Sequence, residues 1–375
     1  MSDKQTANME IKRFNHTSIF RLLREDSLLT KQDIVNALQL CLPTVTQNIN
    51  ELREEGLVTE CGTKGNTGGR RAITYGIVPD ARLAIGLDIT RNHVTCVIVD
   101  LTGAIIYQRR ERKKFENSDL YYRYLGETVR VAVAALSIPR DRVLGVGIGI
   151  PGLVTADNQT VFYGEILNFT GATCQQFSKY IPYPTALLND ANAAGFAEIW
   201  TCPDATTAFY LMLSNNVGGS VIIDGNTYGG KHIHSSEVGH IRIDINGPEC
   251  YCGQKGCVDC YLAATVLSGQ TDGNLSDYFK LLSAGNSEAQ QRWEEYLEHL
   301  AFTVNTLYML FDCPVILGGY VGEYIGDYMN EIKTRAGKLN TFEDNANYLR
   351  ACSYKTEAIA AGSALFYIAR FLEAI

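Results

Sequence analysis

The chain has 375 residues, 20% of them charged, and a formal net charge of −8. This acidic balance argues against a protein that coats nucleic acid indiscriminately. No uninterrupted apolar run approaches the roughly 20 residues needed to span a bilayer, so no membrane partner is expected. The 11 cysteines and the lack of a signal segment at the N-terminus indicate a reduced, cytoplasmic protein. Residues 1–80 are neutral and residues 81–375 carry the acidic excess, so the two parts are expected to do different jobs.

The N-terminal part has the pattern of a helix-turn-helix. Thr30 precedes a helical pattern at 31–38, a tight turn follows at 39–41, and a second helix is expected over 42–53 with Pro43 in its first turn. Apolar residues recur on one face of the second helix. Short polar side chains on the other face are what reading of the DNA major groove requires. The residues expected to contact DNA from this helix are Pro43, Thr44, Thr46, Gln47 and Asn50.

A glycine-rich segment at 62–71 separates two extended runs, and it carries Lys64, Arg70 and Arg71. A hairpin tip with these basic side chains suits contacts with phosphates or the minor groove. We therefore predict a winged helix-turn-helix DNA-binding domain over residues 1–80. The alternative is a helical bundle whose hairpin is merely solvated.

From residue 81 on, strands and helices follow one another in the order typical of an α/β domain. The apolar, glycine-studded strand at 143–150 ends at Pro151-Gly152, as expected for a buried sheet with a ligand loop at its end. A second copy of the strand pattern begins later, and the final helix is expected to pack back on the first part. The other expected elements are strands at 83–88, 94–100, 104–107, 185–188, 208–213 and 220–225, and helices at 121–136 and 356–371.

One imidazole and three thiols at short spacing match a tetrahedral zinc site. The candidate metal ligands are His240, Cys250, Cys252 and Cys257. Four soft ligands leave no open position, so we expect a structural zinc ion. Gly253 and Gly256 let the backbone turn so that the sulfurs can face one ion. Cys260 is an alternative to His240 as the fourth ligand, and the alternatives to a metal are buried free thiols or, in a secreted protein, disulfides.

Four segments together carry a family resemblance: Thr67–Arg71, Leu188–Asn192, Ser236–His240 and the cysteine segment 250–257. On these residues the chain resembles the ROK family of repressors, open reading frames and sugar kinases. It is more similar to the repressor branch of xylose, glucose and N-acetylglucosamine regulators. The resemblance covers residues 19–375 and implies a two-lobed, actin-like or ribonuclease-H-like domain over 81–375, with a cleft between the lobes.

The resemblance also implies a sugar site. In the kinases of the family, the residue that matches Asp190 takes a proton from the sugar hydroxyl. Asn189 and Asp190 follow the expected strand at 185–188, and ligand sites of α/β proteins lie at such strand ends. Asp259 stands where the family usually has Glu. The predicted sugar-binding residues are Asn168, Asn189, Asp190, Glu237, His240 and Asp259. The alternative is that these polar residues only tie loops together.

The chain departs from the kinases at their phosphate loops. Their Asp-x-Gly-Gly-Thr motif appears here as Asp88–Asn92, with Thr90 and Arg91 in the glycine positions, and a second loop at 214–219 keeps only its later glycines. Side chains there obstruct close approach of the backbone to phosphates, whose transfer needs precise charge stabilisation. We therefore expect no enzyme and no catalytic residue, with Asp190 as the base if the protein were a kinase. Relatives also usually have Ser where Cys41 precedes the second helix.

These observations predict a sugar-responsive DNA-binding transcriptional repressor whose kinase-like domain binds a sugar effector without phosphorylating it. One winged helix reads too few bases for useful specificity, so we expect a homodimer or homotetramer on a double-stranded, palindromic operator. The alternative is an ATP-dependent sugar kinase with an added DNA-binding arm. A third hypothesis is a regulator controlled by a protein partner, with the cleft vestigial.

Overall fold

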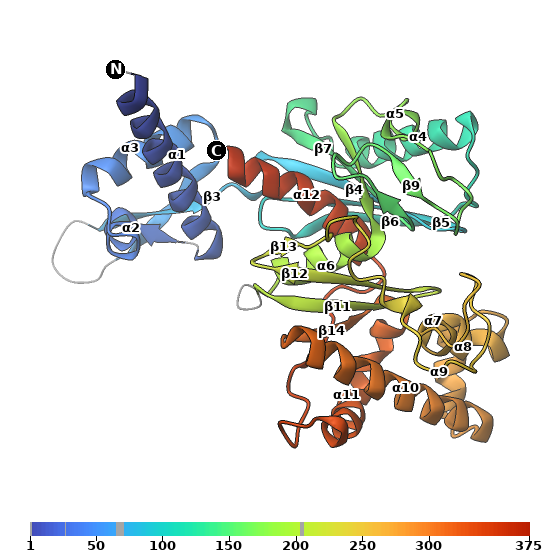
Figure 1. The fold of residues 1–375 in the computed structure, drawn as a ribbon. Coiled ribbons are helices and arrows are strands. Elements are labelled where there is room, and N and C mark those ends of the chain that lie inside the picture. Colours follow the sequence, from blue (N-terminus) through green and yellow to red (C-terminus); the bar gives the residue numbers. More distant parts are fainter. Residues whose placement is uncertain (1, 27, 65–70, 203–205) are drawn as a thin grey trace.

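The structure is a computed structural model that describes residues 2–26, 28–64, 71–202 and 206–375. Its N-terminal region combines helices with a small antiparallel sheet in the order β1–β3–β2 (Figure 1). The elements of this region are α1 (Ser2–Glu25), β1 (Leu29–Thr30), α2 (Lys31–Leu38), α3 (Leu42–Glu54), β2 (Val58–Lys64) and β3 (Ala72–Ile77). The predicted helices at 31–38 and 42–53 are confirmed.

Local interactions explain where α2 and α3 begin and end. The Thr30 side chain accepts a hydrogen bond from the Asp33 amide, and the Asp33 carboxylate accepts one from the Thr30 amide, which forms a capping box at the start of α2. Gln39 adopts a left-handed conformation that ends α2. Cys41 precedes α3 and makes no side-chain capping hydrogen bond, although its thiol lies 3.0 Å from the Thr44 hydroxyl. Pro43 lies in the first turn, where its missing N–H costs nothing.

The first lobe is built on a sheet in the order β10–β7–β4–β5–β6. β7 lies parallel to both β4 and β10, whereas β4, β5 and β6 form an antiparallel meander. The carboxyl ends of β4, β7 and β10 therefore meet at one edge of the sheet. The elements of this lobe are β4 (Leu83–Ile89), β5 (His93–Val99), β6 (Ile105–Arg112), α4 (Asp119–Ala135), β7 (Val143–Ile150), β8 (Leu153–Val154), β9 (Val161–Tyr163), α5 (Cys174–Phe177) and β10 (Thr185–Asn189).

The second lobe has a sheet in the order β13–β12–β11–β14–β15, flanked by α10 and α11 (Figure 1). α6 starts at the end of β10 and runs along this sheet, so it joins the two lobes. The elements are α6 (Asp190–Trp200), β11 (Ala208–Leu213), β12 (Val217–Ile223), β13 (Asn226–Thr227), α7 (Asp259–Leu262), α8 (Ala264–Ser268), α9 (Leu275–Ser283), α10 (Ser287–Phe311), β14 (Val315–Gly318), α11 (Gly319–Leu339) and β15 (Leu349–Ala351).

The last helix, α12 (Ala358–Ala374), packs on β4 and β7 of the first lobe, which confirms the predicted placement. Two glycines explain how closely it approaches. A Cβ atom at Gly86 would lie 1.8 Å from the carbonyl oxygen of Ala360, and one at Gly147 would lie 1.9 Å from that of Ser363. Any larger residue would force the helix off the sheet.

α12 and α6 also pack against the N-terminal region. Buried side chains of α1, α2 and α3 and those of α12, β4 and β5 form one continuous hydrophobic cluster. The Thr17 hydroxyl and the Arg13 guanidinium of α1 donate to main-chain oxygens of Ile375 and Glu373 at the end of α12. Within the described ranges, no helix is long and apolar enough to cross a membrane.

Candidate functional site

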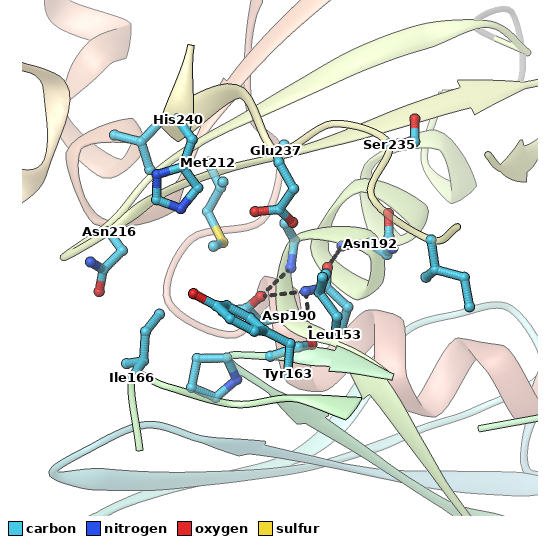
Figure 2. A pocket seen from close by; sticks show the side chains of 18 of the residues that line it. Leu153, Tyr163, Ile166, Asp190, Asn192, Met212, Asn216, Ser235, Glu237 and His240 are labelled. Carbon is cyan, nitrogen blue, oxygen red and sulfur yellow. Dashed lines mark hydrogen bonds between the residues drawn. The ribbon is translucent and has the colours of Figure 1, made fainter. Parts of the chain in front are cut away.

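A cavity of about 720 Å³ lies between the lobes, at the carboxyl edge of β7 and β10. Loops after β7 and β9, the start of α6, the β11–β12 turn and the segment 229–240 line it (Figure 2). Its lining residues include Tyr163, Asn189, Asp190, Asn216, Glu237, His240 and Tyr251. Of the six predicted sugar-binding residues, four line this cavity: Asn189, Asp190, Glu237 and His240.

Asn189 and Asp190 are fixed at the start of α6. The Asn189 side chain accepts a hydrogen bond from the Asn192 amide at 3.0 Å and donates to the Gly152 carbonyl oxygen at 3.1 Å. The Asp190 carboxylate accepts from the amide of Ala191 at 2.8 Å and from the Asn189 side chain at 3.2 Å. Asp190 therefore points into the cavity with its orientation set by the helix end (Figure 2).

The cavity is acidic, and the pKa values of its carboxyl groups are raised. Burial and the nearby Glu237 carboxylate raise the pKa of Asp190 to about 7. Burial also raises the pKa of Glu237. Behind them, burial and the charge of Asp190 raise the pKa of Asp88, on β4, to about 7. Carboxyl groups that are partly protonated near neutral pH both donate and accept hydrogen bonds, which suits the hydroxyl groups of a neutral sugar.

The predicted metal ligands come together beside this cavity. The donor atoms of His240, Cys250, Cys252 and Cys257 all lie within 4.8 Å of one another. The sulfur atoms of Cys252 and Cys257 are 3.7 Å apart, and His240 Nδ1 lies 4.0 Å from the Cys250 sulfur. Tetrahedral zinc with Zn–S bonds of about 2.3 Å places sulfurs about 3.8 Å apart, so this donor set fits the ion. Cys260, the alternative ligand, is not one of these four residues, and its thiol lies 3.7 Å from the Pro248 carbonyl oxygen.

Glycines allow the cysteine segment to fold back as expected. Gly253 and Gly256 have φ values of 82° and 68°, which side-chain-bearing residues rarely adopt. A Cβ atom at Gly256 would lie 1.5 Å from the carbonyl oxygen of Asp244. The fold of the loop therefore depends on this glycine.

His240 belongs to both sites. Its Nδ1 atom faces the cysteine cluster, while Nε2 lies 3.2 Å from the Tyr251 hydroxyl at the cavity wall. The imidazole thus links the metal-ligand cluster to the surface that a ligand would contact.

The model of the ROK family matches residues 84–370, which is most of the chain. The chain belongs to the ROK family. It is 26% identical over 260 residues to the xylose repressor of Bacillus spizizenii, covering 68% of this chain and 67% of that protein. It is 21% identical over 341 residues to the DNA-binding transcriptional dual regulator NagC of Escherichia coli K12, covering 85% and 84%.

Solved structures agree with this ROK fold. A ROK family transcriptional regulator described as a homologue of the E. coli MLC protein matches with a TM-score of 0.77 at 18% identity, over 97% of this chain and 98% of its own. A ROK family glucokinase from Streptomyces griseus, in complex with glucose and AMPPNP, matches with a TM-score of 0.61 at 21% identity, over 76% and 98%. The match to the regulator therefore extends over a larger part of this chain than the match to the kinase.

Two predicted sugar-binding residues do not line the cavity. Asn168 is exposed with a φ of 53°, although Glu165 and Ile166 of the same loop do reach the cavity. Asp259 is buried behind the wall, where its carboxylate accepts a hydrogen bond of 2.6 Å from the Val217 amide and so fixes the start of β12. Their roles in sugar binding remain predictions.

The sequence prediction missed the aromatic walls and the third carboxylate. Tyr163 and Tyr251 line the cavity, and nothing in their local sequence marks them. The sequence indicates Asp88 only as the first residue of an altered phosphate loop. The order of the strands could have indicated its position, because β4 and β10 flank β7 and bring Asp88 close to Asp190.

The predicted DNA-contacting residues of α3 lie on its outer side. Pro43, Gln47 and Asn50 are exposed, and Thr44 and Thr46 are partly exposed. Gln47 donates to the Glu51 carboxylate at 3.0 Å. On the hairpin, Lys64 is exposed and lies 3.8 Å from the Asp33 carboxylate, Arg71 is exposed, and Arg70 lies outside the described residues.

Proposed function

We propose that this ROK protein is a sugar-responsive transcriptional repressor that binds its effector sugar in the inter-lobe cavity and does not phosphorylate it. The observation that carries this proposal is the course of α6. Its first residue, Asp190, lines the cavity, and its last residue, Trp200, stacks against Arg24 of α1, with the guanidinium carbon 4.4 Å from the ring centroid. A change at the cavity is thereby transmitted along one rigid element to the N-terminal region.

DNA binding is proposed for the N-terminal region as a winged helix-turn-helix. α2, the turn at Gln39 and α3 form the helical pair, with α3 as the recognition helix, and β2 and β3 form the wing. The outward polar residues of α3 suit base edges, and the basic hairpin residues suit phosphates. The names of the xylose repressor and NagC support this role. Specific binding would use a dimer on a palindromic operator.

Sugar recognition is proposed for the cavity carboxyls and His240. Asp190 and Glu237 face one another across the cavity (Figure 2), and each can share protons with sugar hydroxyl groups. Structural zinc is proposed for His240, Cys250, Cys252 and Cys257. Zinc held there would cross-link the segment that carries Glu237 and His240, and it would supply no chemistry to a reaction.

The lack of phosphoryl transfer is proposed from the turn between β4 and β5. The Thr90 amide donates to the His93 carbonyl oxygen at 3.0 Å within this hairpin, so it is engaged rather than free to bind a phosphate. Arg91 adds a bulky side chain where the kinases have glycine. Asp190 favours the second candidate function, a sugar kinase, because a base with a pKa raised to about 7 suits proton abstraction.

The test starts from selection of operator DNA with the full-length protein. Operator affinity is then measured by fluorescence anisotropy across a panel of monosaccharides and N-acetylated sugars. We expect one sugar to change operator affinity by about 5- to 150-fold, the usual range of allosteric coupling. If no sugar changes it, effector control by sugar is wrong. Sugar-dependent ADP release at about 1 s⁻¹ or faster would instead establish the kinase.

A further inference from the structure

The lining of the first cavity has a buried part and an exposed aromatic rim. Ala191, Met212 and Val217 line the cavity and are buried. Tyr163 and Tyr251 line it as well, but they remain 43% and 52% exposed. Apolar ring surface left in water is unfavourable, and exposed rings gathered at one opening are typical of a surface that a ligand covers. We call these two side chains the tyrosine rim.

The first lobe holds Tyr163 in a fixed place relative to Asp190. Tyr163 ends β9 and pairs with Leu153 of β8. A Cβ atom at Gly152 would lie 2.8 Å from the Tyr163 carbonyl oxygen, so these two backbone segments are in contact. The Gly152 carbonyl oxygen also accepts the 3.1 Å hydrogen bond from Asn189, which precedes Asp190. The same loop therefore positions the ring of the rim and the carboxyl group of the cavity.

The second lobe holds Tyr251 in a fixed place relative to His240. The Tyr251 hydroxyl lies 3.2 Å from His240 Nε2, and the two rings meet edge to face with their centroids 5.2 Å apart. Tyr251 also lies between Cys250 and Cys252, two members of the metal-ligand cluster. Because the two tyrosines come from opposite lobes, one ligand in contact with both would bridge the lobes.

The cavity offers fewer polar contacts to a sugar than the sequence predicts. Asn168 and Asp259 do not line it, so four of the six predicted sugar-binding residues remain. A single sugar ring uses such groups through its hydroxyls. The C–H faces of a sugar ring are apolar, and they gain free energy when they pack against an aromatic ring. The tyrosine rim supplies that kind of surface beyond the carboxyl groups.

The neighbouring space on the other side is of a different kind. A second inter-lobe cavity of about 1420 Å³ lies beyond the β11–β12 turn, and Arg91, Arg110 and Arg112 line it. The Arg91 guanidinium donates at 2.8 Å to the carbonyl oxygen of Ile166, which lines the first cavity, so this hydrogen bond lies at the boundary between the two. A ligand that extends from the first cavity over apolar surface therefore leaves past the tyrosine rim.

We propose that the effector is a disaccharide, with one ring at Asp190 and Glu237 and the second ring against Tyr163 and Tyr251. This inference rests on the proposed sugar-binding function and names the class of sugar. The second ring contacts both lobes and holds them in one relative position. A disaccharide therefore changes operator affinity more than its constituent monosaccharide does.

Isothermal titration calorimetry of the full-length, zinc-loaded protein tests the proposal. The probes are xylose, glucose and N-acetylglucosamine, each compared with its own disaccharides: xylobiose, cellobiose, laminaribiose, maltose and diacetylchitobiose. We expect one disaccharide to bind at least about ten-fold more tightly than its monosaccharide, because the second ring buries additional apolar surface.

Three variants show whether the tyrosine rim is the cause. Tyr163→Ala should lower the ratio of disaccharide to monosaccharide affinity to about three-fold or less, and Tyr163→Phe, which keeps the ring, should restore it. Tyr228→Ala is the matched control, since Tyr228 is 52% exposed and is not among the lining residues. Unfolding temperatures check that the variants fold.

The possible failures are distinguishable. A monosaccharide that binds as tightly as every disaccharide, and changes operator affinity as much, would overturn this inference and leave the proposed function standing. An affinity ratio that Tyr163→Ala leaves unchanged would also overturn it. If no sugar of either size binds, both this inference and the proposed function are wrong.

Discussion

The two inter-lobe cavities differ in charge and in how far they keep the family pattern. The first is lined by Asp190 and Glu237, two of the predicted sugar-binding residues, and its carboxyl pKa values are raised. The second is lined by Arg91, Arg110 and Arg112, and of these only Arg91 lies in the altered phosphate loop. Under the proposed function, Asp190 serves sugar binding while the phosphate loops have changed, so sugar binding would be kept and phosphoryl transfer lost.

Loss of the metal ligands should have the largest effect, because the first cavity is lined by the ligand His240 and by Tyr251 of the cysteine segment. We expect Cys257→Ser to lose zinc and to lower the free energy of unfolding by about 3 kcal/mol or more, since structural zinc contributes directly to folding. Sugar affinity should fall with it. Metal analysis and thermal unfolding measure both effects.

Cys260→Ser is the control for this variant, because Cys260 neighbours the cluster but is not one of the four residues whose donor atoms lie within 4.8 Å of one another. It should keep its zinc and its unfolding temperature. A Cys257→Ser protein as stable as the wild type, in the presence or absence of zinc, would show that the cluster holds no structural metal.

The next effect concerns Asp190 itself. Asp190→Asn keeps the shape and an oxygen that can accept from the Ala191 amide, but it removes the exchangeable carboxyl proton and the charge. We expect sugar affinity, measured by calorimetry, to fall about 10- to 100-fold, as for the loss of one hydrogen bond to a charged group.

Asn168→Gly sharpens this result, because glycine accepts the φ of 53° at this exposed position. If Asn168 is not a sugar ligand, this variant should bind sugar like the wild type. A sugar affinity that Asp190→Asn leaves unchanged would place the sugar outside the first cavity.

A smaller effect is expected where α6 meets the N-terminal region. Arg24→Gln removes the contact with Trp200, and a cation–π contact contributes about 0.5–2 kcal/mol. We expect the change in operator affinity caused by sugar to shrink by about 2- to 20-fold, while sugar affinity without DNA stays within about two-fold. Arg21→Gln, an exposed neighbour on α1, is the matched control. An equal loss in both variants would show a general charge effect on DNA binding.

The smallest expected effect is on the pH dependence of the free energy of unfolding. The pKa values of Asp88 and Asp190 rise from an ordinary 3.8 to about 7 in the folded protein. Between pH 4 and 7 the folded state holds protons that the unfolded chain has released. The free energy of unfolding from this source is therefore highest below pH 4 and falls as the pH rises through 7.

Urea unfolding of the wild type and of Asp88→Asn across this range measures the effect, and the variant should show a flatter profile. Asp80→Asn, at an exposed carboxylate paired with Arg142, should leave the slope unchanged. A slope that is identical in all three proteins would mean that Asp88 ionises normally.

The sequence predicted the helices and strands better than it predicted which residues from distant strands lie together around the cavities. The strands at 143–150 and 208–213 were predicted at their observed bounds, because continuous apolar runs mark buried strands. The strand expected at 220–225 begins earlier, at Val217, since its two glycines resembled a loop. The cysteine cluster was predictable because short spacing brings its ligands together. Other positions depend on how distant strands pack, which sequence spacing does not encode. They are the place of Asp88 beside Asp190, of Asp259 behind the cavity wall, and of the arginines of β6.

One measurement tests the separation of the two activities most directly. Operator binding and ADP release are followed in the same sample while the effector sugar is titrated in the presence of ATP. We predict a sugar-dependent change in operator affinity of about 5- to 150-fold with no sugar-dependent ADP release. Sugar-dependent ADP release at about 1 s⁻¹ or faster, with operator affinity unchanged, would contradict the account and identify a kinase.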